Sequence, residues 1–119
     1  MKRILLVDID KDFRNAFKTC VSEEKLLVEV IDAESVEQGI KIFSESSGKF
    51  SAVMVDGRSS EGWGVTLVRE IQKSYPAQII AISGHPTAKI EMKKAGCVSF
   101  PKPFTPGKLV NLINNLPEA

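Results

Sequence analysis

The stretch ILLVD at residues 4–8 places four large apolar residues in a row before a carboxylate. An apolar run without polar alternation predicts a strand buried on both faces, which is typical of a parallel sheet. The same pattern returns in AVMVD at residues 52–56 and in IIAIS at residues 79–83. We therefore predict buried strands that each end at a polar residue, over residues 3–7, 52–55 and 79–82.

Segments with helical periodicity separate these strands. In the first of them, apolar residues recur at intervals of three and four, and we expect them on one inner face. These residues are Phe13, Ala16, Phe17, Cys20 and Val21. Asp10 or Asp12 can cap the start of this helix, because a carboxylate there accepts backbone N–H groups that have no helical partner.

Two further strands are predicted over residues 27–31 and 97–100, and a helical pattern follows each of the five strands. Thr105 and Pro106 open the last helix. Alternating strands and helices predict a parallel sheet with helices on both faces. Right-handed crossovers restrict the topology, and the flavodoxin-like strand order 2-1-3-4-5 fits five units. We predict an α/β, flavodoxin-like (βα)5 fold.

Length and charge exclude several classes of function. A chain of 119 residues is large enough for one core, so residues 1–119 are interpreted as a single domain. The formal net charge is +1 and the basic residues are dispersed, which argues against direct binding of nucleic acid. No apolar run approaches membrane-spanning length, so we expect a soluble, cytoplasmic domain without membrane contact.

Four polar residues lie where predicted strands end: Asp8, Asp56, Ser83 and Lys102. The strands of a parallel sheet end at a common edge, so residues far apart in the chain can meet there. Two carboxylates, a hydroxyl and an ammonium at one edge form a set suited to phosphoryl transfer. Asp56 can then attack phosphorus and become an aspartyl phosphate.

Each of these residues also has an ordinary structural explanation. Asp56 can cap a turn, Ser83 can cap the next helix, and a lysine is usually solvated. The pairing of Asp8 with Asp56 favours a functional site, because neighbouring carboxylates repel each other unless a cation joins them. Mg²⁺ is such a cation, since it takes oxygen ligands.

Taken together, these motifs resemble the response-regulator receiver domain of bacterial two-component signalling, over essentially the whole chain. The matching stretches are ILLVD ending at Asp8, VMVDGR around Asp56, Gly64 at the start of the third helix, IIAISG around Ser83, and KPF at residues 102–104. The resemblance implies a phosphoacceptor signalling domain, with at most self-catalysed phosphorylation and dephosphorylation rather than turnover of a substrate.

The resemblance also implies roles for individual residues. Asp56 accepts the phosphoryl group from a sensor histidine kinase or a phosphotransfer protein. Asp8, Asp56 and the backbone carbonyl of Arg58 bind Mg²⁺, while Ser83 and Lys102 contact the phosphoryl oxygens.

A switch implied by the resemblance links this site to partners. Ser83 and an aromatic residue of the fifth strand rotate together and change the surface formed by the fourth helix, the fifth strand and the fifth helix. A downstream protein then recognises that surface. Phe100 is the candidate aromatic residue, although the segment from Gly96 to Lys102 is one residue shorter than usual, and this register can instead place Ser99 there.

The sequence departs from the family pattern at the metal site. The family usually has two adjacent acids after the first strand, and here Ile9 occupies the second position. Isoleucine cannot bind Mg²⁺, so we expect weak metal binding, and whether Asp10 substitutes is open. The family often has Met-Pro where this chain has Ser59 and Ser60.

Two alternatives follow from these features. Ile9 favours a receiver-like module that binds a partner without ever being phosphorylated. The spacing of Asp8 and Asp10 also resembles the D-x-D opening of haloacid-dehalogenase-like phosphatases. That enzyme family requires a further acidic pair after its lysine, and Glu118 is the only acidic residue beyond Lys102.

Overall fold

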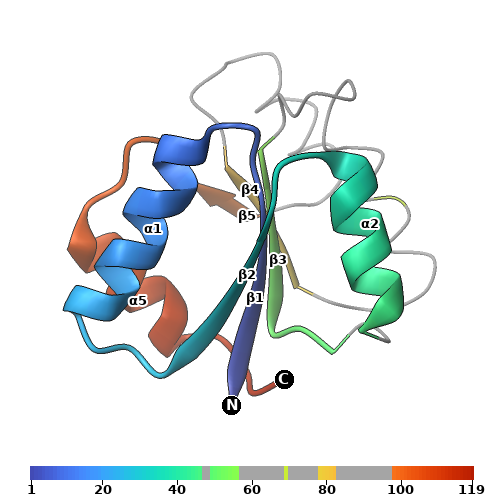
Figure 1. Cartoon of the computed structure of the whole chain (residues 1–119). Coiled ribbons are helices and arrows are strands. Elements are labelled where there is room, and N and C mark those ends of the chain that lie inside the picture. The colour runs from blue at the N-terminus through green and yellow to red at the C-terminus, as the bar shows by residue number, and fades with distance from the viewer. Residues whose placement is uncertain (47–48, 57–68, 70–77, 83–97) are drawn as a thin grey trace.

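A computed structural model describes residues 1–46, 49–56, 69, 78–82 and 98–119. Five parallel strands form one sheet in the order β2-β1-β3-β4-β5, as the sequence predicted. Helices α1 and α5 cover one face and α2 covers the other (Figure 1). The elements are β1 (Lys2–Val7), α1 (Lys11–Glu23), β2 (Val28–Ala33), α2 (Val36–Glu45), β3 (Ala52–Asp56), β4 (Gln78–Ile82), β5 (Val98–Phe100) and α5 (Pro106–Asn114).

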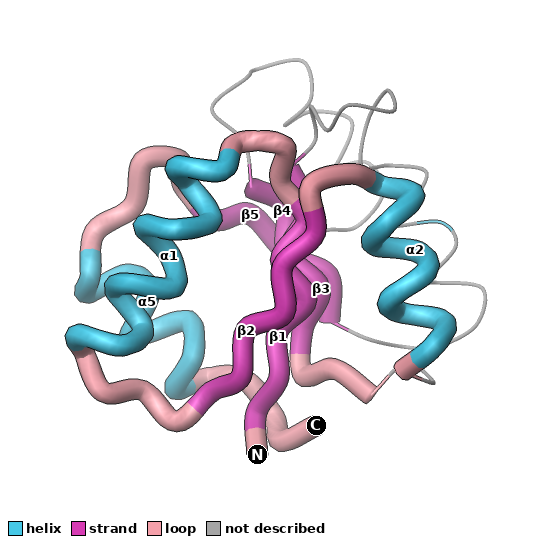
Figure 2. Tube along the Cα trace, in the orientation of Figure 1, coloured by secondary structure: helices cyan, strands magenta, loops and turns pink. Residues whose placement is uncertain are grey.

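The register of the sheet brings the carboxyl ends of the strands to one edge (Figure 2). Val7, the last residue of β1, pairs with Ala33 of β2 and with Val55 of β3. β2 extends two residues beyond the predicted end at residue 31, because Asp32 and Ala33 still pair with β1. The helices predicted after residues 57–62 and 84–86 lie outside the described residues.

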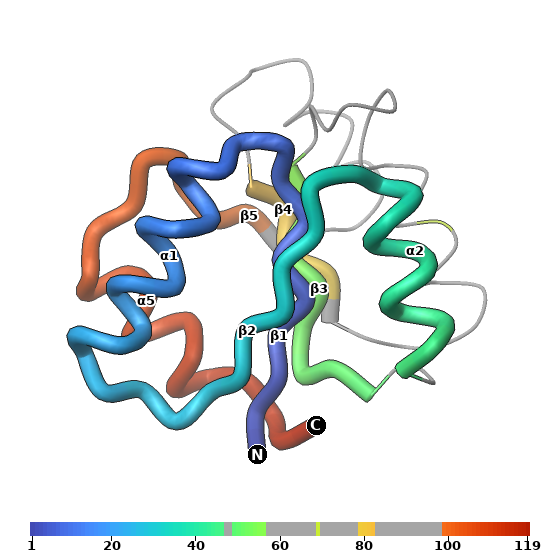
Figure 3. The backbone as a smooth tube through the Cα atoms, viewed as in Figure 1, coloured from blue at the N-terminus to red at the C-terminus, as the bar shows by residue number. Residues whose placement is uncertain are grey.

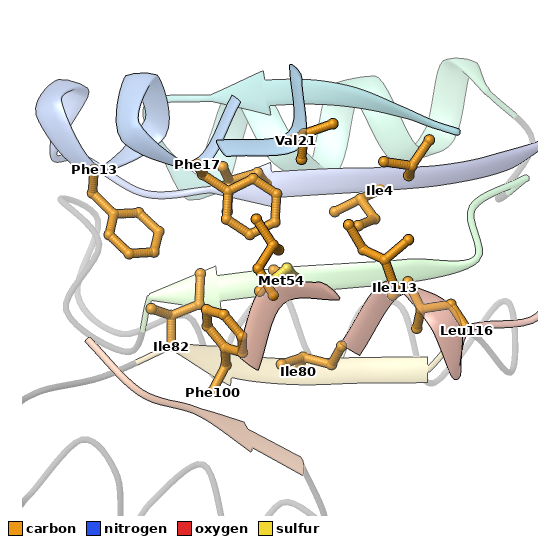
Figure 4. Close-up of a cluster of buried hydrophobic side chains, with 14 residues drawn as sticks. Ile4, Phe13, Phe17, Val21, Met54, Ile80, Ile82, Phe100, Ile113 and Leu116 are labelled. Carbon is orange, nitrogen blue, oxygen red and sulfur yellow. The ribbon is translucent and has the colours of Figure 1, made fainter. Parts of the chain in front are cut away.

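The sheet separates two hydrophobic clusters, because successive side chains of a strand point to opposite faces. One cluster lies under α1 and α5 and is shown in Figure 4; its buried members include Ile4, Leu6, Met54, Ile80, Ile82, Phe100, Phe17, Leu109 and Ile113. The other lies under α2 and includes Leu5, Val7, Val53, Val55, Ile79, Val36 and Phe43. The apolar runs of β1 and β3 are therefore buried on both faces, as predicted, whereas β2 carries the exposed Glu29 and β5 the exposed Ser99.

Helix α1 presents a slightly different face to the core from the predicted one. Asp10 is its N-cap, and Phe13, Phe17 and Val21 are buried. The prediction that Ala16 faces inward is wrong, because Ala16 is exposed. At about 100° per residue, the buried stripe is centred between Phe17 and Val21, and Ala16 falls outside it.

The last helix follows the predicted pattern. Thr105 caps α5, where its hydroxyl accepts the N–H of Lys108 at 3.3 Å, and Pro106 occupies the first turn. α5 returns the chain to the amino end of the sheet, beside the start of β1 (Figure 3). There the N–H of Ala119 donates to the carbonyl of Met1 at 3.4 Å. None of the helices in the described ranges has the length and hydropathy to cross a bilayer.

We expect Phe17→Ala to lower the free energy of unfolding by about 3–5 kcal/mol, because the ring is completely buried at the centre of the α1/α5 cluster and truncation leaves a cavity. Urea denaturation monitored by circular dichroism measures this change. Leu27→Ala is the matched control, because Leu27 is 83% exposed and its truncation should change stability by less than about 0.5 kcal/mol. Equal losses in the two variants would contradict the packing described above.

Candidate functional site

Two carboxylates lie side by side at the carboxyl edge of the sheet. Asp56 is the last residue of β3, and Asp8 directly follows β1. The pairing of Val7 with Val55 places these strand ends next to each other. The Asp8 residue is 0% exposed and Asp56 is also buried. Their charges therefore cannot be screened by bulk water and need a nearby cation.

Lys102 supplies that cation. Its Nζ donates to Asp8 Oδ2 at 3.0 Å and to Asp8 Oδ1 at 3.3 Å, and it donates to Asp56 Oδ2 at 3.1 Å. The lysine side chain is 23% exposed. The structure thus brings together three of the four polar strand-end residues that the sequence singled out. Ser83 and Arg58 lie outside the described residues.

The electrostatics of the site reflect this arrangement. Burial raises the pKa of Asp8, and the neighbouring Asp56 charge raises it too, although hydrogen bonds from the Asp10 N–H and from Lys102 act in the opposite direction. Burial lowers the pKa of Lys102, but its hydrogen bonds to Asp8 and Asp56 outweigh this effect and the pKa lies above its ordinary value. Lys102 is therefore firmly protonated near neutral pH.

The backbone of Asp8 is held on both sides. Its N–H donates to the carbonyl of Ala33 at 3.0 Å, and its carbonyl accepts Arg14 Nη1 at 2.6 Å. Arg14 Nε in turn donates to Asp32 Oδ2 at 3.0 Å. These contacts fix the point at which the chain leaves β1, and therefore fix the direction of the Asp8 carboxylate.

Sequence reasoning missed the buried Arg14. The available signal was its spacing, since Arg14 lies three residues before Phe17 and seven before Val21, on the same helical stripe. The pKa of Asp32 reflects its ion pairs. Burial alone would raise this pKa, but the hydrogen bonds from Lys18 and Arg14 outweigh burial, so the pKa of Asp32 lies below its ordinary value. The sequence identified neither member of this pair.

The oxygen atoms at this edge suit a hard cation, although the chain has one acidic residue fewer here than the family usually has. Carboxylate oxygens of Asp8 and Asp56 are the ligands that Mg²⁺ prefers. Ile9 is 52% exposed and offers no ligand atom. Asp10 Oδ1 accepts the N–H groups of Asp12 and Phe13, while its Oδ2 lies 3.9 Å from Lys102 Nζ. Within the described ranges, no three acidic, histidine or cysteine residues form a ready-made metal cluster.

The two candidate switch residues of β5 face opposite sides of the sheet. Phe100 is buried under α1, where its ring lies 6.4 Å from the Phe17 ring and 5.5 Å from the Phe104 ring, measured between centroids. Ser99 is exposed and pairs with Ala81, a residue of the α2-side cluster. In this structure Phe100 is a core residue, and Ser99 is the one accessible from outside.

The sequence model of the response regulator receiver domain matches residues 4–114. The chain belongs to this family. It is therefore a response regulator receiver domain of two-component signalling, and its sheet order is the one seen in that fold. A search of curated proteins found no significant match to the chain.

Solved structures of receiver domains superpose closely on the chain. A response regulator receiver domain protein from Clostridium thermocellum has a TM-score of 0.82 at 28% identity, with 97% of this chain and 93% of that chain covered. A CheY-like receiver domain protein from Methanospirillum hungatei has a TM-score of 0.81 at 24% identity, with coverages of 96% and 91%. Chemotaxis protein CheY4 from Vibrio cholerae has a TM-score of 0.79 at 20% identity, with coverages of 98% and 99%, and shares the fold.

The general properties of the receiver domain family apply to this chain as a member. Receiver domains are signalling domains and are generally not enzymes. They generally bind Mg²⁺ at the phosphorylation site, and they interact with histidine kinases or phosphotransfer proteins and with downstream partners. In this receiver domain, Asp8, Asp56 and Lys102 meet at the carboxyl edge of the sheet.

We expect Lys102→Met to raise the pKa of Asp8 further, because the substitution removes the ammonium that favours the charged carboxylate and leaves the repulsion from Asp56 in place. NMR titration of the carboxyl carbons measures this pKa. Lys108→Met is the matched control, since Lys108 is an exposed lysine of α5. An Asp8 pKa that is equal in the two variants would contradict the observed ion pairs.

Proposed function

We propose that residues 1–119 form one cytoplasmic receiver domain that accepts a phosphoryl group on Asp56 from a sensor histidine kinase or a phosphotransfer protein. The observation that carries the proposal is the position of Lys102, whose ammonium contacts the Asp56 carboxylate and the neighbouring Asp8 at 3.0–3.3 Å. A carboxylate that is buried beside a fixed ammonium can act as a nucleophile toward an anionic phosphoryl donor. Family membership favours this activity over that of a phosphatase.

The proposed transfer is a single displacement at phosphorus. A carboxylate oxygen of Asp56 forms a bond to phosphorus, and the bond from phosphorus to the donor breaks, with its electron pair leaving on the donor nitrogen or oxygen. Lys102 then faces the new phosphoryl oxygens and offsets their charge, and Ser83 donates its hydroxyl to one of them. Asp8, with Asp56 and the carbonyl of Arg58, would hold Mg²⁺, which supplies further positive charge to the phosphoryl oxygens.

Phosphorylation would act by shifting the equilibrium between conformations that the domain already samples. The modified site favours one arrangement of Ser83 and of the surface that includes β5 and α5, and a downstream protein binds that arrangement more tightly. Phe100 stays the candidate switch aromatic, because Ser99 has no ring to rotate; the Phe100 ring packs against Phe17 and Phe104.

One observation supports a second candidate function, a receiver that binds its partner without phosphorylation. The apolar side chain of Ile9 is half exposed beside the site, where the family usually has a metal-binding acid. In this reading the Lys102 ion pairs are permanent structural contacts, and the partner surface does not change.

Asp56→Asn should abolish phosphorylation, because the amide lacks the nucleophilic oxygen charge. Intact mass spectrometry after incubation with Mg²⁺ and acetyl phosphate measures the gain of one phosphoryl group. Asp12→Asn is the control, since Asp12 is an exposed carboxylate of α1. Modification of Asp56→Asn to the wild-type extent would show that the acceptor is elsewhere, and no modification of the wild type by donor or kinase would favour the second candidate.

Ile9→Asp should strengthen Mg²⁺ binding, because it adds a carboxylate beside Asp8 at a half-exposed position that needs no repacking. Isothermal titration calorimetry with Mg²⁺ measures the dissociation constant. Ile9→Asn is the matched control, because it has nearly the same shape without the charge. Unchanged affinity in Ile9→Asp would show that the missing acid does not limit metal binding.

A further inference from the structure

The position of the Lys102 ammonium decides what the site can do, yet the lysine lies outside any helix or strand. Lys102 follows the end of β5 and precedes α5, and its ammonium reaches Asp8 and Asp56 from this connecting segment. A lysine side chain has several rotatable bonds, and holding it in one geometry carries an entropic cost. Hydrogen bonds to Asp8 and Asp56 define one side of its environment, and any further contact to the ammonium would restrict it more.

The ring of Phe13 provides that contact. Lys102 Nζ lies over this ring, 4.8 Å from its centroid. This distance is within the range in which the negative face of an aromatic ring attracts an ammonium. The ammonium is therefore held between two carboxylates and an aromatic face, and Phe13 contacts it from the α1 side of the sheet.

Phe13 is itself held in place. It is buried in the first turn of α1, and its N–H donates to Asp10 Oδ1 at 3.2 Å as part of the helix cap. Its ring meets the Phe104 ring edge-on, with centroids 5.7 Å apart and planes at 80°, and it also packs against Phe17. Figure 4 shows Phe13 beyond Phe17, at the end of the cluster toward which β3 points.

The same aromatic cluster also supports the lysine's own segment. Phe104 follows Lys102 by two residues and packs against Phe13, Phe17 and Phe100. A leucine at position 13 could fill similar space, but it would offer no negative face to the ammonium. The ring therefore does more than pack, because it also attracts the charge that bridges Asp8 and Asp56.

We propose that Phe13 is a positioning residue that holds the Lys102 ammonium against Asp8 and Asp56 through a cation–π contact. The consequence for phosphoryl transfer rests on the function proposed above for Lys102. With Phe13 in place the ammonium stays at the edge of the sheet where the phosphoryl oxygens arrive, and without the ring it spends more time in solvent.

The test combines a spectroscopic signature with a rate. The ring current of Phe13 should shift the Lys102 Hε resonances upfield of those of exposed lysines, and NMR of the wild-type protein measures this shift. In Phe13→Leu the upfield shift should be lost, and phosphorylation by acetyl phosphate at saturating Mg²⁺ should slow by at least about two- to fivefold, the factor that corresponds to the weaker cation–π contacts. Phe13→Tyr should keep the shift and most of the rate.

Val21→Ala is the matched control, because Val21 is a buried residue of the same cluster on α1 and has no ring to place beside Lys102. It should lower the melting temperature while leaving the Lys102 shift in place. Equal loss of the rate in Phe13→Leu and Val21→Ala, or a Lys102 shift that survives in Phe13→Leu, would overturn the proposal. If Phe13→Leu fails to fold, site-specific replacement of Phe13 by a trifluorinated phenylalanine keeps the shape and weakens the negative face, and an unchanged rate would then overturn it.

The experiment distinguishes failure of the Phe13–Lys102 contact from failure of the proposed phosphorylation of Asp56. The ring-current shift is measured on the unmodified protein, so it tests the Phe13–Lys102 contact even if the wild type accepts no phosphoryl group. Absence of wild-type phosphorylation from both acetyl phosphate and a phosphorylated kinase would remove the proposed function and the effect of Phe13 on its rate, and the positioning contact would be judged by the shift alone.

Discussion

The repulsion between two carboxylates at adjacent strand ends is the constraint on which this receiver domain depends. Asp8 and Asp56 are brought together by the pairing of β1 with β3, and Asp8 has no exposed surface. A buried charge of this kind is tolerated only with a partner and with hydrogen bonds to its remaining lone pairs. Lys102 and the Asp10 N–H supply these contacts to the Asp8 carboxylate, and Arg14 donates separately to the Asp8 backbone carbonyl.

The first turn of α1 connects this constraint to the core. Asp10 caps the helix and leaves its second carboxylate oxygen near Lys102, Phe13 lies under the ammonium, and Arg14 reaches back to Asp8. These three residues belong to one short segment, yet they contact groups from β1 and from the chain that follows β5. The geometry of the site therefore depends on how α1 packs against the sheet, because a shift of the start of this helix would change all three contacts.

Much of this arrangement could be predicted from the sequence. The apolar runs ending at Asp8 and Asp56 identified the strands and their common edge, and Lys102, after the predicted fifth strand, supplied the third member of the site. Arg14 was missed, because an arginine on an apolar stripe is normally assumed to be solvated, and its burial depends on Asp32 at the end of a neighbouring strand. The side of β5 that Phe100 occupies could not be predicted either, since a three-residue strand is too short for periodicity to fix its phase.

The order of these residues along the chain has a consequence for synthesis on the ribosome. Asp8 and Asp56 are made well before Lys102, which is separated from Asp8 by 94 positions. A domain generally folds as a unit, rather than segment by segment. A nascent chain that ends before β5 already contains both carboxylates but lacks the ammonium that contacts them in the folded domain. The contacts that offset the repulsion between Asp8 and Asp56 can therefore form only after the segment that follows β5 has been made.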